Sequence, residues 1–400
     1  MESEVNKREL VVRSGLRLLE MGLVERTWGN VSSKLGDRYF AITPSGASYT
    51  TLLAEDIVVV ELHTLRFNST KKPSSELQLH AKIYNQFPNI NFILHTHQSW
   101  ASLLSLFCAN KMSRIELPFQ RHNMLGRYLP CAKYAEAGSE EIANNVVDAI
   151  ISAYPSNCQL GFGIALMASH GVVVFAKTDS EAFSLVENLE SIAKNIIKKK
   201  LSLALSLGSD SSILDFNIRT KIQLFDITKD TFPICNKALS QFFSCLLNAR
   251  LLSDDIFYFF APFFYDNIIS YATNICCNQK KLLDTNNPSS FFYKMFVYFD
   301  DVAQIGGASF KIINLEKDQV SVENLFLNFE DSNVLILKDY GVLIASSSKE
   351  DAFSAISLLE KNSYAFLLSL YDRNIMPLSA HNAKELHASY VKGYSKLKDK

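Results

Sequence analysis

The sequence has few of the features that mark secreted or membrane proteins. Its seven cysteines are scattered along 400 residues and form no CxxC pair, which argues against a disulfide framework or a zinc ribbon. The first residues, Met1–Leu10, are charged and lack the apolar core of a signal peptide, and the longest aromatic stretch, Ile256–Tyr265, is too short to span a bilayer. We therefore expect a cytoplasmic protein with no export signal and no membrane anchor.

The chain also lacks an excess of charge of either sign. Forty basic and 41 acidic side chains leave a net charge of -1, so no overall field attracts nucleic acid or an anionic membrane. Hydrophobic residues make up 48% of the chain and aromatic residues 12%, which is enough to bury substantial cores. Because 400 residues exceed the usual size of a single core, we expect two domains.

Hydrophobic periodicity predicts a mixture of helices and strands in the first half. Helices are expected at Asn6–Met21, Ser75–Gln86 and Ser180–Leu203. Strand-like runs are expected at Val31–Lys34, Tyr39–Thr43, Ile57–Glu61, Asn91–His97, Gly163–Ala168 and Val172–Ala176. This order predicts an α/β fold of the α+β type, in which helices flank a central, largely antiparallel sheet.

The second half of the chain resembles the first in two places. Leu166–Val173 aligns with Ile336–Leu343 at a constant offset of 170 residues, and Pro73-Ser74-Ser75 recurs as Pro288-Ser289-Ser290. We interpret this as a degenerate internal duplication. The Gly- and Ser-containing segment 206–212 is the expected linker between a domain at 1–205 and a second domain at 213–400.

Three histidines are candidate metal ligands. His95 and His97 lie two positions apart at the end of an apolar strand, so both imidazoles point to the same face. His170 lies between two further predicted strands. A lone HxH also arises by chance at strand ends, but three histidines with an open fourth position are typical of a catalytic zinc site.

Several small polar residues could bind an anion. Ser74-Ser75-Glu76 begins a predicted helix, where unpaired backbone N–H groups attract negative charge. The loops Trp28–Ser32 and Thr43–Gly46 offer further amides and hydroxyls. Each segment alone fits plain helix capping or a turn equally well. His80 follows Glu76 by one helical turn and could support the site residues, although a packed or surface helix histidine is the more typical interpretation of this spacing.

Taken together, these segments resemble the class II aldolase and adducin family. The family pattern is a GN loop, a TPSG turn, an SSE helix start, an HxH strand and a later SHG, and all five occur in order within residues 29–171. The resemblance implies that His95, His97 and His170 bind Zn²⁺ or another divalent ion such as Mn²⁺, Fe²⁺ or Co²⁺. It also implies that Glu76 is the acid/base. The implied phosphate-binding residues are Gly29, Asn30, Ser45, Gly46, Ser74 and Ser75.

The resemblance implies a metal-dependent lyase of the aldolase type. Such an enzyme cleaves or forms a carbon-carbon bond in a small phosphorylated sugar through an enediolate. We expect a pocket of low dielectric constant to raise the pKa of Glu76 toward a useful value. Dehydratase, decarboxylase and 4-epimerase activities remain alternatives, although such epimerases usually carry Asp in place of Glu76 and near Gln120. An adducin-like binding or scaffolding protein without catalysis is a further alternative.

The second half has lost the candidate ligands. No histidine lies between Gly208 and His381, Tyr340 takes the place of His170, and Phe291 takes that of Glu76. We expect Gly307-Ala308-Ser309 to replace the HTH strand. The second domain is therefore predicted to be metal-free. Because members of the family form rings of four, the resemblance also implies a homo-oligomer, with two tandem chains forming a pseudo-tetrameric dimer.

Overall fold

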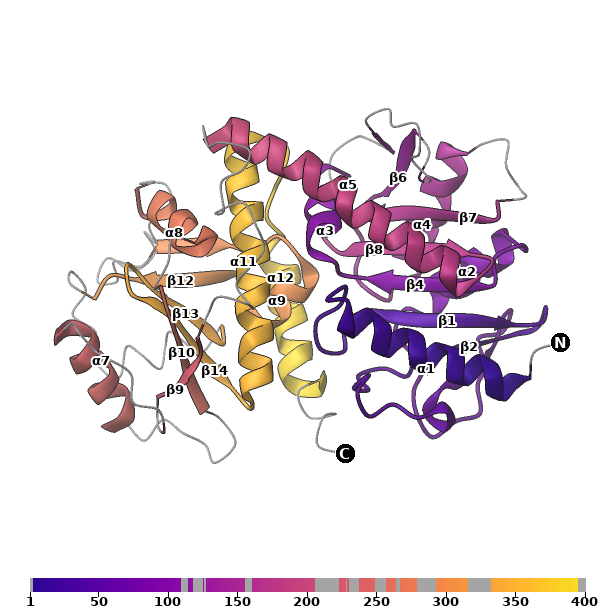
Figure 1. The fold of residues 1–400 in the computed structure, drawn as a ribbon, viewed down its shortest axis with the longest axis horizontal. Coiled ribbons are helices and arrows are strands. Elements are labelled where there is room, and N and C mark those ends of the chain that lie inside the picture. The colour runs from indigo at the N-terminus through magenta and orange to yellow at the C-terminus, as the bar shows by residue number, and fades with distance from the viewer. Residues whose placement is uncertain are drawn as a thin grey trace. The chain divides into compact units, whose positions relative to one another are not determined.

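The chain divides into two compact units, Met1–Lys200 and Leu201–Lys392 (Figure 1). The computed structural model describes residues 3–108, 114–117, 125, 127–154, 160–205, 223–227, 229, 237–248, 257–263, 267–278, 293–315 and 332–394. The linker expected at 206–212 lies outside these residues.

An eight-stranded sheet forms the centre of the first unit. Its strands, in spatial order, are β3 (Val58–Glu61), β2 (Tyr39–Ile42), β1 (Asn30–Leu35), β4 (Phe92–Thr96), β8 (Gly171–Ala176), β7 (Phe162–Met167), β6 (Tyr128–Ala132) and β5 (Arg114–Glu116). Neighbouring strands are antiparallel except for β6 and β7, which are parallel. The predicted largely antiparallel sheet is confirmed.

The helices of this unit are α1 (Glu4–Glu20), α2 (Leu77–Gln86), α3 (Ser99–Ser105), α4 (Glu140–Ala153) and α5 (Asp179–Leu205), with short 3-10 turns at Ala54–Asp56 and Leu106–Cys108. Helix α1 begins at Ser3, whose hydroxyl accepts from the Asn6 backbone N–H, and the chain leaves it through Gly22 at φ 66°. The three expected helices are present within a few residues of their predicted bounds. Helices α3 and α4 and strands β5 and β6 were not expected.

Helices α2 and α4 pack together over one face of the sheet. Leu79 and Ile83 of α2 and Val146 of α4 are buried there against Val60 and Phe175 of the strands. Apolar residues at helical spacing therefore hold α2 on the sheet and fix the direction in which its N-terminal end points.

Cys108 and Cys131 form a disulfide that joins the turn after α3 to β6. The scattered cysteine spacing did not predict this pairing.

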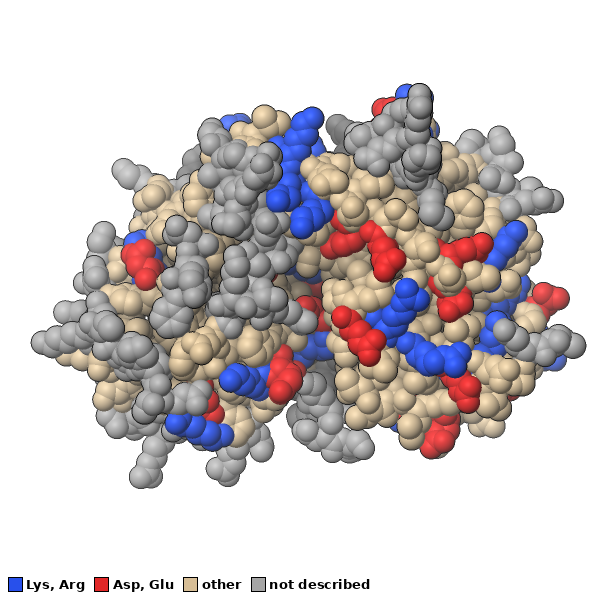
Figure 2. All heavy atoms as spheres, in the orientation of Figure 1, with Lys and Arg blue, Asp and Glu red and all other residues tan. Residues whose placement is uncertain are grey.

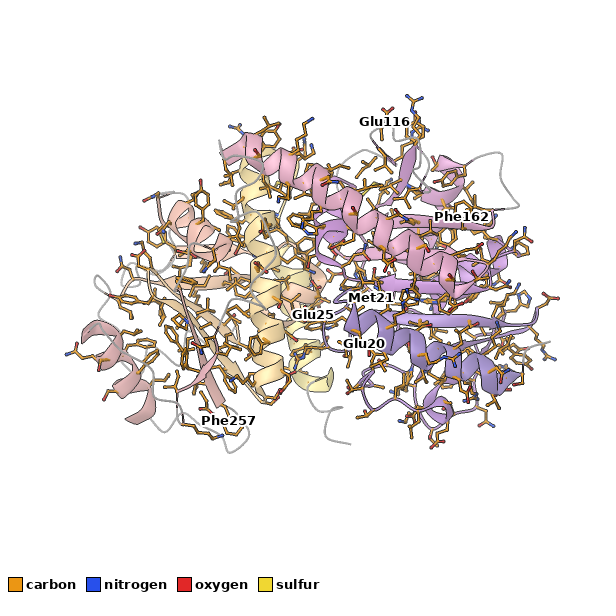
Figure 3. All side chains as sticks on the ribbon, in the orientation of Figure 1. Glu20, Met21, Glu25, Glu116, Phe162 and Phe257 are labelled. Carbon is orange, nitrogen blue, oxygen red and sulfur yellow. A yellow bond between two sulfur atoms is a disulfide. The ribbon has the colours of Figure 1, made fainter. Side chains whose placement is uncertain are left out.

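A six-stranded sheet forms the centre of the second unit. Its strands, in spatial order, are β11 (Tyr293–Phe296), β12 (Ser309–Ile313), β13 (Val334–Leu337), β14 (Gly341–Ser346), β10 (Phe257–Pro262) and β9 (Phe225–Asp226). Strand β10 starts at Phe257, which is labelled in Figure 3. The described helices are α7 (Lys237–Asn248), α8 (Ile268–Asn278), α9 (Asp300–Gly306), α11 (Lys349–Tyr371) and α12 (Ala380–Ser389), followed by a π turn at Tyr390–Tyr394.

The second sheet has the strand order of six strands of the first. Strands β9, β10, β14, β13, β12 and β11 take the places of β1, β4, β8, β7, β6 and β5. The directions also agree, because β12 and β13 are the parallel pair, as β6 and β7 are. The hairpins before β8 and β14 both contain a residue with a left-handed backbone, Ser169 at φ 56° and Asp339 at φ 66°.

Acidic and basic side chains lie side by side over the strands and helices of the first unit on the face drawn in Figure 2. This mixture agrees with the near-zero net charge of the chain. Within the described residues, every helix is too short or too polar to cross a bilayer.

Candidate metal centre

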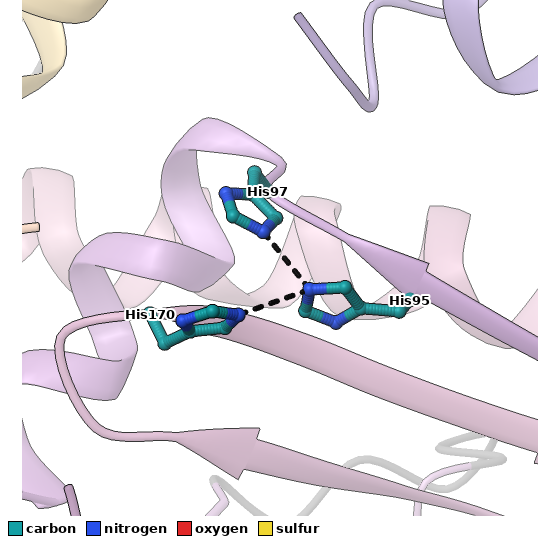
Figure 4. Close-up of side chains that lie close together, drawn as sticks. All are labelled: His95, His97 and His170. Atoms are coloured by element: carbon teal, nitrogen blue, oxygen red, sulfur yellow. Dashed lines mark hydrogen bonds between the residues drawn. The ribbon is translucent and has the colours of Figure 1, made fainter. Parts of the chain in front are cut away.

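Two neighbouring strands bring the three candidate histidines together (Figure 4). His95 lies in β4, and His97 follows the end of that strand. Strand β4 pairs with β8 so that Thr96 opposes Val172, which places the hairpin residue His170 at the same end of the sheet. The exposed fractions of His95, His97 and His170 are only 0%, 7% and 3%. The predicted convergence of the HTH and SHG segments is therefore present in the fold.

The imidazoles converge through their Nε2 atoms. The Nε2 atom of His95 lies 2.9 Å from that of His97 and 3.2 Å from that of His170. The Nδ1–H of His95 donates to the carbonyl oxygen of Val172 at 2.9 Å, so its Nε2 presents a lone pair to the centre. Burial lowers the pKa of His95 to about 3, which keeps this imidazole in the neutral form that binds metals.

The carboxylate of Glu76 completes the cluster. Glu76 is the N-cap residue of α2 and is 5% exposed. Its Oε2 lies 3.1 Å from His95 Nε2, and its Oε1 lies 3.1 Å from His170 Nε2. The side-chain amide of Asn30 donates to Oε2 at 2.8 Å. The end of α2 therefore aims this carboxylate at two of the three histidines.

The expectation of a raised pKa for Glu76 is wrong. Burial pushes the pKa of this carboxyl upward, but the electrostatic influence of the adjacent His95 and His170 rings and the hydrogen bonds from His170 and Asn30 lower it by more. The pKa of Glu76 therefore lies well below its usual value. The group is therefore a carboxylate at neutral pH.

The donor set fits a divalent cation. The lone pair of His95 Nε2 faces two other imidazole nitrogens and a carboxylate oxygen, all of which are acceptors when deprotonated. Glu76 Oε1 is buried, and apart from His170 Nε2 at 3.1 Å it has no hydrogen-bond partner. A cation at this point would bind the converging nitrogen lone pairs and the buried carboxylate oxygen. Three imidazoles suit zinc and several other divalent ions. Among the described residues, these histidines are the group that could hold a metal.

Two glycines allow the strands to approach the histidines. A Cβ atom at Gly171 would lie 2.5 Å from the Thr96 carbonyl oxygen and 3.2 Å from the His97 ring. Gly29 has φ 97°, and a Cβ atom there would lie 2.7 Å from the carbonyl oxygen of His95. The glycines of the GN and SHG motifs are therefore required by close packing around the HTH strand.

The Thr43–Gly46 turn and the segment before α2 lie side by side. The backbone N–H of Ser45 donates to the Lys72 carbonyl, and that of Ser74 donates to the Thr43 carbonyl. Ser74 is buried, and its hydroxyl accepts from the Glu76 backbone N–H, whereas Ser75 is exposed. Gly46 has φ 72°. The fold thus brings two of the three candidate anion-binding segments together beside Glu76.

The Asn30 side chain makes its contacts inside the protein, not at the phosphate-binding position that the resemblance implies. Its amide nitrogen donates to Glu76, and its Oδ1 lies 2.5 Å from His80 Nε2. The side chain is therefore committed to Glu76 and His80.

His80 is the residue that the sequence interpretation undervalued. It is 0% exposed and lies between Asn30 and Ser32, whose hydroxyl is 2.6 Å from His80 Nδ1. The spacing of one helical turn from Glu76 was a usable signal, because such residues share a helix face. Gln120, also considered in the sequence, lies outside the described residues.

The register of the second sheet identifies the counterparts of the histidines. His95 pairs with Val173 in the first sheet, and Phe260 pairs with Leu343 at the matching place in the second. By the same register, Pro262, which pairs with Gly341, takes the place of His97. If the second unit is a copy of the first, the replacement of HTH is therefore Phe260-Ala261-Pro262.

The expected counterpart at Gly307-Ala308-Ser309 is wrong. Ser309 begins β12, which pairs with β11 and β13 and so takes the place of β6. The segment Pro288–Phe291 lies outside the described residues. Helix α7 precedes β10 as α2 precedes β4, so the sequence order also argues against this segment as the counterpart of Pro73–Glu76.

Comparisons with known proteins agree on one family for the first unit. The family model described as the Class II Aldolase and Adducin N-terminal domain matches residues 9–197. The chain is 34% identical over 193 residues to the L-fuculose phosphate aldolase of Methanocaldococcus jannaschii, covering 46% of this chain and 94% of that protein. It is 28% identical over 191 residues to the 5-deoxy-D-ribulose 1-phosphate aldolase of Bacillus thuringiensis, covering 47% of this chain and 83% of that protein.

A third relative has a different activity in its name. The chain is 42% identical over 97 residues to the probable L-ribulose-5-phosphate 4-epimerase of Mycoplasma pneumoniae, covering 24% of this chain and 40% of that protein. The match to almost the full length of an aldolase at 34% identity, together with the family model over residues 9–197, shows that this chain belongs to the class II aldolase and adducin family.

Proposed function

We propose that the first unit is a metal-dependent lyase that cleaves or forms a carbon-carbon bond in a small phosphorylated sugar. The observation that carries this proposal is the convergence of three buried imidazole nitrogens beside a buried carboxylate, with Glu76 3.1 Å from both His95 and His170. His95, His97 and His170 would hold Zn²⁺, Mn²⁺, Fe²⁺ or Co²⁺. Such an ion supplies positive charge that stabilises negative charge developing on the substrate oxygens.

Glu76 would move the proton of this reaction. In the direction of bond formation, its carboxylate would accept a proton from the carbon beside the substrate carbonyl, which leaves an enediolate. In the direction of cleavage, the same carboxyl group would return that proton to the enediolate carbon. The lowered pKa of Glu76 supports the role of proton acceptor at neutral pH.

The small polar residues beside Glu76 would bind the substrate phosphate. Ser45, Ser74 and Ser75 offer hydroxyl groups, and Gly29 and Gly46 allow close approach to the backbone. Phosphate binds well to such clusters of hydroxyl and backbone N–H groups near a helix start. We assign the Asn30 side chain to Glu76 instead, because both ends of its amide are already engaged there.

An epimerase is the second candidate. The name of the Mycoplasma pneumoniae relative favours it, since that match has 42% identity, although over only 24% of this chain. Glutamate at position 76 favours the aldolase, and the full-length similarity to an aldolase supports the same choice.

We further propose that the second unit is a degenerate copy of the first that holds no metal. The shared strand order supports this proposal, and so does the presence of Phe260, Pro262 and Tyr340 at the positions of the histidines. Two such chains would then provide the four aldolase-like units of a pseudo-tetrameric dimer. Light scattering of the purified chain would test this assembly, and a monomer at micromolar concentration would argue against it.

Product analysis would test the proposed reaction. The metal-loaded chain would be incubated with L-fuculose 1-phosphate, 5-deoxy-D-ribulose 1-phosphate and L-ribulose 5-phosphate, and the products separated by chromatography and identified by mass spectrometry and NMR, which distinguishes epimers. Cleavage of either ketose 1-phosphate to dihydroxyacetone phosphate and an aldehyde is expected. Conversion of ribulose 5-phosphate to its 4-epimer without cleavage would identify an epimerase, and no conversion of any substrate would contradict the proposed lyase for this substrate class.

A further inference from the structure

A chain of buried side chains runs from Glu76 into the core between α2 and β1. Asn30 contacts Glu76 at 2.8 Å, His80 contacts Asn30 at 2.5 Å, and Ser32 contacts His80 at 2.6 Å. The chain ends at Tyr84, whose hydroxyl lies 2.7 Å from the Ser32 hydroxyl. Each of these five residues is at most 5% exposed, so their hydrogen bonds are made within the protein.

The direction of every hydrogen bond in this chain follows from its end at Glu76. A carboxylate only accepts, so Asn30 must present its NH₂ group to Glu76 and its Oδ1 to His80. His80 must therefore carry its proton on Nε2 and donate it to Asn30. Burial lowers the pKa of His80 to about 4, so the imidazole is neutral and its Nδ1 is an acceptor.

The remaining two bonds are then fixed as well. The Ser32 hydroxyl must donate to His80 Nδ1, which uses its single proton. Tyr84 must donate to the Ser32 oxygen, and burial raises the pKa of Tyr84, which keeps its hydroxyl protonated. All four donors thus point toward Glu76, and hydrogen bonds aligned in this way strengthen one another.

We infer that His80 is a positioning residue, which acts through Asn30 to hold the Glu76 carboxylate in place for proton transfer. This inference rests on the proposed function, in which Glu76 moves the proton. Without the His80 donor, the Asn30 amide can rotate and turn its oxygen toward the carboxylate. Glu76 then loses its hydrogen bond from Asn30 and its fixed orientation. The three histidines keep their positions and orientations. The substrate class is unaffected, because His80 contacts Asn30 and Ser32 and no candidate phosphate-binding hydroxyl among the described contacts.

Steady-state kinetics on three variants would test this role. His80→Leu removes the donor, and we expect kcat to fall roughly 10- to 100-fold, as is common when a supporting hydrogen bond at a metal site is lost. KM and metal content should stay near their wild-type values. His80→Gln keeps an N–H donor and a carbonyl acceptor, so it should recover most of kcat. His63→Leu is the matched control, since His63 is exposed, and it should leave all three quantities unchanged.

Nitrogen-15 NMR of histidine-labelled wild-type protein would test the same inference without turnover. One imidazole should be in the neutral Nε2–H form and should stay neutral from pH 8 to 5, before and after metal removal, and its signal should be absent in His80→Gln. A charged imidazole or an Nδ1–H form for His80 at pH 7 would overturn the inference. So would a folded, metal-loaded His80→Leu protein with wild-type kcat. If the wild type converts no sugar phosphate, the proposed function fails, and the NMR result alone decides the hydrogen-bond chain.

Discussion

Gly171 lies directly against the backbone of Thr96, so that a Cβ atom at this glycine would be 2.5 Å from the Thr96 carbonyl oxygen. The contact joins the hairpin that contains His170 to the strand that contains His95. The spacing of the three imidazoles therefore depends on the absence of one side chain.

Gly171→Ala should disturb the metal site and the fold together. The added methyl must push β8 away from β4, and overpacking of this kind costs about 1–3 kcal/mol. We expect a lower unfolding midpoint in urea and reduced metal content by plasma mass spectrometry. Gly36→Ala is the control for metal content. A Cβ at Gly36 meets no atom within 4 Å, but its φ of 62° strains an alanine there, so the unfolding midpoint should fall while the metal content stays unchanged. Full metal binding by Gly171→Ala would show that the close contact does not set the site.

Glu76→Gln should separate metal binding from catalysis. The amide has the shape of the carboxylate but cannot accept the proton, so turnover should fall by roughly 100-fold or more. Metal content should remain at the wild-type level, since the three histidines are unchanged. Glu116→Gln, at an exposed position in β5, should behave like the wild type. Near-normal turnover by Glu76→Gln would rule out the proposed role of this residue.

The purified chain should bind about one equivalent of divalent metal, all of it in the first unit. His95→Ala should abolish this binding, because His95 Nε2 is the central nitrogen of the cluster. Tyr340→Ala, at the position equivalent to His170, should leave the metal content unchanged. Metal analysis after dialysis would measure both. Two equivalents in the wild type would contradict a metal-free second unit.

His80 should make the stability of the chain depend on pH. Its pKa is lowered by burial from 6.5 to about 4 in the folded state, so the unfolded chain takes up a proton first as the pH falls. The contribution of neutral His80 is fully present above about pH 6.5 and is lost progressively down to about pH 4, which amounts to about 3 kcal/mol. Urea unfolding of wild type and His80→Gln between pH 7 and 4 would measure it. Equal pH dependence in the two proteins would show that His80 is not buried as a neutral group.

The sequence predicted the parts of the site that follow from local patterns. His95 and His97 share a face because alternate strand residues do, and the five motifs identified the family in the correct order. Helix α4 was not predicted, although Ser139 caps it by accepting from the Ile142 backbone N–H, because that segment carries none of the site motifs.

Pairing between distant segments was the main source of error. The counterpart of HTH was predicted at Gly307–Ser309, in the strand expected after the repeated Pro-Ser-Ser and its helix. Strand register favours Phe260–Pro262 instead. The pKa of Glu76 was expected to rise because burial favours the neutral carboxyl, but its neighbours His95 and His170 lower that pKa by more. In both cases the deciding contacts join residues far apart in the chain.

The two sheets place different groups at equivalent positions. In the first, three imidazoles and a carboxylate are buried, and the burial of these polar groups opposes folding unless a cation joins them. In the second, Phe260 and Pro262 fill the matching places with apolar surface that favours folding by itself. A cation bound as proposed would therefore stabilise the first unit, whereas the apolar groups at the matching places of the second unit stabilise it without a ligand.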